Sequence, residues 1–136
     1  MPTSADTVTD LPGVLKRLAE LEPERFYLSA HEGEPTIDLY HDNEELTYFL
    51  ATLPGCGSAA LWVEGAVREA IEARGWSWEC IGMPGRAGAS IYRPYDPTRP
   101  DTDMLMGECL QPGIDSPALA LALAYLRALE AQGGPA

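Results

Sequence analysis

The apolar residues of this chain recur at two different spacings, and the sequence changes from one spacing to the other several times. Between Leu11 and Leu21 they are three or four residues apart, behind the capping residue Asp10, as on one face of a helix. The segments Arg25–Ala30 and Thr36–His41 are instead rich in aromatic and β-branched residues and flank a turn at Glu32–Pro35, which predicts a β-hairpin. A chain that alternates short helices with hairpins is typical of an α+β domain.

Three further helices are predicted from capping residues, and they follow Asp42, Ser58 and Ser116. The first of them has Glu45 at its third position and its apolar residues within Leu46–Leu53. We therefore expect the chain to return to helix directly after the first hairpin.

The second half of the chain again places strands after a helix. Trp76–Ile81 and Ala89–Arg93 predict a second hairpin around the glycine-rich stretch Met83–Gly88, and Met104–Leu110 predicts a further strand. The predicted order is α-β-β-α followed by α-β-β-β-α.

This order predicts one α+β domain over residues 11–132, behind a flexible N-terminus of residues 1–10. We expect an antiparallel sheet built from hairpins, with helices packed on it. Residues 11–53 and 58–131 would form two αββα-like halves, and their slight sequence similarity leaves open whether they are a pseudo-repeat.

The charge balance excludes some classes of partner. The 136 residues include 21 acidic and 9 basic ones, which gives a formal net charge of −12. Affinity for a phosphate backbone comes from Lys and Arg side chains that displace counterions, so direct binding of nucleic acid or of an anionic membrane is disfavoured. The longest apolar run, Ala118–Leu126, is far too short to span a bilayer and predicts a buried helix.

The N-terminal residues and the cysteines indicate the compartment. Met1–Asp10 is small, polar and acidic, unlike a secretory signal. The three cysteines form no C-x-x-C pair, so neither a disulfide framework nor a zinc site is indicated. We expect a cytoplasmic protein that requires no cofactor.

A helix ending in Ala73–Trp76, a meander through Ile91–Arg93 and the alanine- and leucine-rich helix Ser116–Glu130 lie between Trp62 and Ala131. In these features the second half of the chain resembles the phage ABA-sandwich domain family of small phage and prophage proteins. The resemblance covers roughly half of the chain and rests on structural motifs. It implies a helix–sheet–helix sandwich, a place in the cytoplasm of an infected or lysogenic bacterial cell, and no catalytic residues to transfer.

Acidic residues are concentrated in one part of the chain. Nine of them lie between Glu20 and Glu45 beside a single basic residue, Arg25, and this segment carries eight of the twelve net negative charges. A folded surface that keeps carboxylates together attracts basic partners, although carboxylates on exposed faces also serve solubility alone. The residues expected to bind a partner are Glu32, Glu34, Asp38, Asp42, Glu44 and Glu45.

These features favour a non-enzymatic, acidic phage-type accessory protein. It would bind the basic surface of a host or phage protein and inhibit a host protein that handles nucleic acid by mimicking nucleic acid, as an anti-CRISPR protein does. An immunity protein against a basic toxin would present the same kind of surface. Whether two copies pair, through a sheet edge or through the helix Ala118–Leu129, stays open.

An alternative of another class is a small enzyme or ligand-binding domain. Its pocket would lie between the helices and the sheet, near His31, His41 and Asp38. The spacing of the two histidines on the predicted hairpin places them several residues out of register, so they are not expected to share a metal site.

Overall fold

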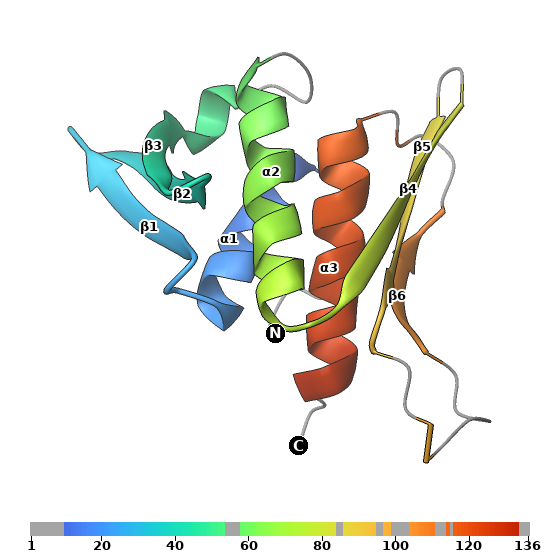
Figure 1. Cartoon of the computed structure of the whole chain (residues 1–136). Coiled ribbons are helices and arrows are strands. Elements are labelled where there is room, and N and C mark those ends of the chain that lie inside the picture. The colour runs from blue at the N-terminus through green and yellow to red at the C-terminus, as the bar shows by residue number, and fades with distance from the viewer. Residues whose placement is uncertain are drawn as a thin grey trace.

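Helix α3 (Pro117–Gly133) lies in the middle of the molecule, as Figure 1 shows, and its side chains are buried on nearly all sides. The computed structural model describes residues 10–53, 58–83, 86–94, 97–98, 104–110, 114 and 116–133. The hydroxyl of Ser116 accepts a hydrogen bond from the Leu119 amide at 3.2 Å, and Pro117 occupies the first helical position, as predicted. A helix that is apolar all round is stable only when other elements surround it, and here they do.

Two further helices pack against α3. Helix α1 (Leu11–Leu21) begins where the Asp10 carboxylate accepts a hydrogen bond from the Gly13 amide at 2.9 Å, and its residues Leu15 and Leu18 are fully buried. Helix α2 (Ser58–Ala73) is followed by Gly75, whose φ of +78° is the left-handed conformation expected after a helix. Among the described residues, no helix is both long enough and apolar enough to cross a membrane.

Two antiparallel sheets of three strands each flank the layer of helices (Figure 1). The first consists of β1 (Phe26–His31), β2 (Glu34–His41) and β3 (Glu44–Phe49), and the second of β4 (Ser77–Met83), β5 (Arg86–Tyr92) and β6 (Leu105–Cys109). The α+β class and the packing of helices on sheets are confirmed. The strands form two sheets rather than one, and the helices lie between them.

The prediction of a helix over Leu46–Leu53 is wrong. Residues up to Phe49 form strand β3, and only Leu50–Thr52 turn as a short 3₁₀ helix, η1. Asp42 does not cap a helix: it and Asn43 have φ of 55° and 64°, which is the backbone of a two-residue hairpin turn. Each half of the chain therefore contains a helix followed by a three-stranded meander.

The second sheet lies against α3 so closely that one of its positions has no room for a side chain. A Cβ on Gly107 of β6 would meet the backbone oxygen of Ala124 and would lie 2.5 Å from the backbone nitrogen of Ala128. Glycine is the residue that permits such an approach of two backbones.

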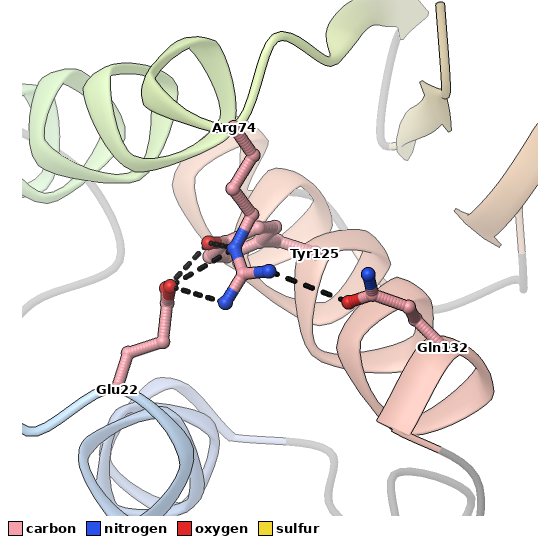
Figure 2. A network of polar contacts seen from close by, with 4 residues as sticks. All are labelled: Glu22, Arg74, Tyr125 and Gln132. Atoms are coloured by element: carbon pink, nitrogen blue, oxygen red, sulfur yellow. Dashed lines mark hydrogen bonds and ion pairs between the residues drawn. The ribbon is translucent and has the colours of Figure 1, made fainter.

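A polar network connects the ends of the three helices (Figure 2). Arg74 donates to Glu22 from Nε at 3.0 Å and from Nη2 at 2.7 Å, and it also donates to the hydroxyl of Tyr125 at 3.0 Å and to Gln132 at 3.3 Å. The Tyr125 hydroxyl in turn donates to Glu22. Burial of Tyr125, together with its hydrogen bond to Glu22, raises the pKa of its hydroxyl, so the side chain remains neutral and in the network.

Candidate functional site

The first sheet packs one face on the helices, and most side chains of its other face are exposed; Thr36, with an exposed fraction of 3%, is buried on that second face. Cross-strand register places Phe26 opposite Leu39, and both are fully buried against the helices. Tyr27 lies opposite Asp38, and Asp38 lies opposite Thr47. These side chains point to the other face of the sheet, because successive side chains of a strand alternate between its two faces. We call this the outer face of the first sheet.

Large aromatic rings are exposed on the outer face. Tyr27, Tyr40 and Phe49 have exposed fractions of 54%, 45% and 43%. Register and alternation place carboxylates among them, with Glu45 directly opposite Tyr40. We call the aromatic and acidic residues of this face the outer-face patch, and they are Tyr27, Glu34, Asp38, Tyr40, Glu45 and Phe49.

Two hydrogen-bonded pairs order the carboxylates of this patch. The hydroxyl of Thr47 donates to the Asp38 carboxylate at 2.6 Å. A hydrogen bond to Glu45, together with the negative charge of that residue, raises the pKa of the Tyr40 hydroxyl. Two of the three carboxylates of the patch, on Asp38 and Glu45, therefore accept a hydrogen bond from a side chain of the neighbouring strand.

The structure divides the six acidic residues expected to bind a partner. Glu34, Asp38 and Glu45 lie on the outer face, along the length of the strands. Glu32 lies in the turn between β1 and β2 with φ of 51°. Asp42 and Glu44 lie beyond the opposite end of β2. That strand runs seven residue steps from Glu34 to His41, so its two ends are about 23 Å apart.

At that opposite end, His41 forms a pair with Glu69 of α2. The His41 Nδ1 and the Glu69 carboxylate are 2.6 Å apart, and the same carboxylate accepts the Asp42 amide at 2.9 and 3.0 Å. The imidazole lies flat against Gly65, where three ring atoms would be within 2.7 Å of a Cβ. The ring of Trp62 meets it edge to face at a centroid distance of 5.1 Å.

An open pocket of about 350 Å³ lies beside this pair, between the β2–β3 turn and the first half of α2. Its lining residues are His41, Asp42, Glu44, Ser58, Leu61 and Trp62. Of the residues named for the alternative hypothesis of a ligand pocket, only His41 lies here. His31 pairs with Glu34 at the far end of β2, and Asp38 points to the outer face.

Sequence reasoning missed the members of this pocket that α2 contributes. Leu61 of α2 is apolar, yet it has an exposed fraction of 64%. Trp62, Gly65 and Glu69 share one helical face, and Glu69 meets His41 across 28 residues of sequence. Gly65 is the residue that could have indicated this contact from the sequence, because a glycine inside a helix often has a packing reason, such as a neighbouring group that lies close to the backbone.

The described part of the chain offers no group of three His, Cys, Asp or Glu side chains that could hold a metal ion. The chain matches no protein-family model, and comparisons with curated proteins and with solved structures find no match. The function is therefore argued from the geometry of the outer-face patch and of the pocket.

Proposed function

We propose that this chain is a non-enzymatic binding protein whose outer-face patch binds the basic surface of a protein that handles nucleic acid, and that it inhibits this partner by occupying the groove meant for nucleic acid. The observation that carries the proposal is the exposure of three aromatic rings among three carboxylates on one face of a sheet.

The rings supply the affinity in this proposal. Tyrosine and phenylalanine are enriched in the cores of protein interfaces, where a few large side chains contribute most of the binding energy. With roughly half of each ring exposed, Tyr27, Tyr40 and Phe49 have apolar surface left to bury against a partner.

The carboxylates supply the choice of partner. Glu34, Asp38 and Glu45 carry no ion pair with a described basic residue, so their charges remain available to cations of another molecule. The net charge of −12 extends this attraction over the whole protein and speeds encounter with a basic surface.

The resemblance of the second half to the phage ABA-sandwich domain guides the choice of partner to test. A phage-type accessory protein acts inside a bacterial cell, where basic grooves belong to complexes that handle nucleic acid. An immunity protein would use the same patch on a basic toxin, so the identity of the captured partner separates these two hypotheses.

The test is capture from a bacterial lysate at low and at high salt, with the intact protein as bait. We expect a nucleic-acid-binding protein at low salt and much less of it at high salt, because exposed charges are screened over about 8 to 10 Å at physiological ionic strength. The purified partner should then lose its nucleic acid when the protein is added.

The decisive comparison uses two triple variants with equal changes of charge. Glu34→Gln, Asp38→Asn and Glu45→Gln neutralise the patch while keeping the shapes of its side chains. Glu24→Gln, Glu79→Gln and Glu108→Gln neutralise three exposed acidic residues outside the first sheet. Capture should be lost with the first variant only; equal loss with both variants would reduce the effect to net charge and refute the role of the patch.

A further inference from the structure

The pocket beside His41 has the chemistry of a site for a cation with a flat, partly apolar body. Two carboxylates, Asp42 and Glu44, line it together with the indole of Trp62 and the exposed side chain of Leu61. None of the described residues that line it is a Lys or Arg that would neutralise these carboxylates. Carboxylates pair with an organic cation, and an indole face attracts it further.

The two rings of the pocket are held in place before any ligand arrives. The Trp62 Nε1 donates to the backbone oxygen of Leu39 at 3.3 Å, and His41 is fixed between Glu69 and Gly65. A site whose groups are already oriented loses less entropy on binding than one that must order them.

The imidazole adds an acceptor. An ionised carboxylate only accepts hydrogen bonds, so the Nδ1 of His41 donates to Glu69, and the tautomer that carries its proton on Nδ1 alone has an acceptor at Nε2. Among the described residues, Nε2 has no hydrogen-bond partner. In that tautomer the pocket offers acceptors of two kinds to a ligand with several donors, the imidazole of His41 and the carboxylates of Asp42 and Glu44.

We propose that this pocket binds the guanidinium group of an arginine side chain. Arginine fits better than lysine because its planar fork presents five N–H donors and stacks on aromatic faces. A volume of about 350 Å³ lies at the small end of ligand pockets and suits one long side chain. This inference rests on the proposed function in one respect: the arginine would be presented by the basic partner.

The experiment uses the intact protein and Nα-acetyl-arginine amide, so it requires no knowledge of the partner. The indole N–H signals of the three tryptophans are followed by NMR during the titration, and the spectrum of Trp62→Phe identifies the signal of Trp62. We expect the Trp62 signal to move with arginine amide and to remain in place with Nα-acetyl-citrulline amide, which has the same shape without the charge.

Variants test the residues that would hold the guanidinium. Glu44→Gln should weaken the apparent affinity about tenfold, the loss typical of one charge-assisted hydrogen bond. Gly65→Ala places a methyl group where the imidazole lies and should weaken binding similarly. Glu79→Gln, which removes one exposed carboxylate on β4, should leave the affinity unchanged.

Nα-acetyl-lysine amide is titrated as a second control, because it carries the charge without the planar fork. Three results would overturn the proposal: no movement of the Trp62 signal with arginine amide, equal movement with the citrulline or the lysine amide, or equal weakening in Glu44→Gln and Glu79→Gln. If Gly65→Ala fails to fold, the isosteric Glu44→Gln still decides the question. Failure of the pocket alone would leave partner capture intact in Glu44→Gln, whereas failure of the proposed function would leave arginine amide binding with no partner captured.

Discussion

Replacing Gly107 by alanine should separate the second sheet from α3. The added Cβ would lie 2.5 Å from the backbone nitrogen of Ala128, whereas ordinary contacts of a Cβ begin near 3.4 Å. Strand β6 would therefore have to move away from the helix by about 1 Å. The backbone oxygen of Ala124 and the backbone nitrogen of Ala128 cannot move individually to make room, because both belong to the buried helix α3.

The expected loss follows from two opposing terms. Overpacking of a well-filled interior costs about 1 to 3 kcal/mol, and this site should lie at the upper end because the backbone of α3 is surrounded on all sides. Alanine gains back about 0.5 to 1 kcal/mol over glycine in a strand. The free energy of unfolding should fall by about 2 kcal/mol, which lowers the melting temperature by roughly 8 °C in a domain of this size.

A matched variant separates packing from the general effect of removing a glycine. Gly82 of β4 lies in the same sheet, and a Cβ built there meets no atom within 4 Å. Gly82→Ala should leave the free energy of unfolding within about 0.5 kcal/mol of the original or raise it slightly. Urea denaturation of both variants is the assay, and coincident curves for the two variants would refute the argument from close packing.

Three other substitutions probe separate parts of the fold. Leu123→Ala, at a fully buried position of α3, should cost about 2 to 5 kcal/mol in urea denaturation, and a loss below about 0.5 kcal/mol would mean that this helix face is exposed. Tyr125→Phe removes a hydroxyl bonded to Glu22 and Arg74 and should cost about 1 to 2 kcal/mol. Because burial raises the pKa of Tyr125, its contribution is complete below the ordinary tyrosine pKa of about 10 and is lost as the pH rises above it. Stability at alkaline pH should therefore decline less steeply in the phenylalanine variant, and parallel declines would contradict this. At the β2–β3 turn, Asn43→Val should cost about 1 to 2 kcal/mol and Asn43→Gly almost nothing, because φ is 64° there; equal melting temperatures would argue against the turn.

The elements that the sequence predicted well are those with local determinants. Asp10 and the apolar spacing of Leu11–Leu21 are sufficient for α1, and Ser116 and Pro117 for the start of α3. Each of these helices requires only a cap and a periodic apolar face, and both can be recognised within one segment. The number of sheets could not be inferred in this way, because it depends on which strands pair.

The failure at Leu46–Leu53 shows where local determinants conflict. Asp42 followed by Glu45 fits a helix start, but Asp and Asn are also among the residues that tolerate φ above zero in a two-residue turn. The choice between the two is made by β2, since His41 can pair with Glu44, and Leu39 with Leu46, only if the chain turns back at once. That pairing also positions His41 against α2, so the same error concealed the pocket.

Folding accounts for one face of the first sheet more fully than for the other. Phe26, Ile37 and Leu39 are fully buried against the helices and are explained by the core. On the outer face, strand propensity alone is satisfied by a residue such as Thr47, which is β-branched and exposes little apolar surface. Tyr40 and Phe49 instead expose large rings beside carboxylates. Because much of each ring stays in contact with water, these rings contribute little hydrophobic stabilisation to the monomer. The surplus of aromatic surface at these positions is the physical reason to look for a partner on this face.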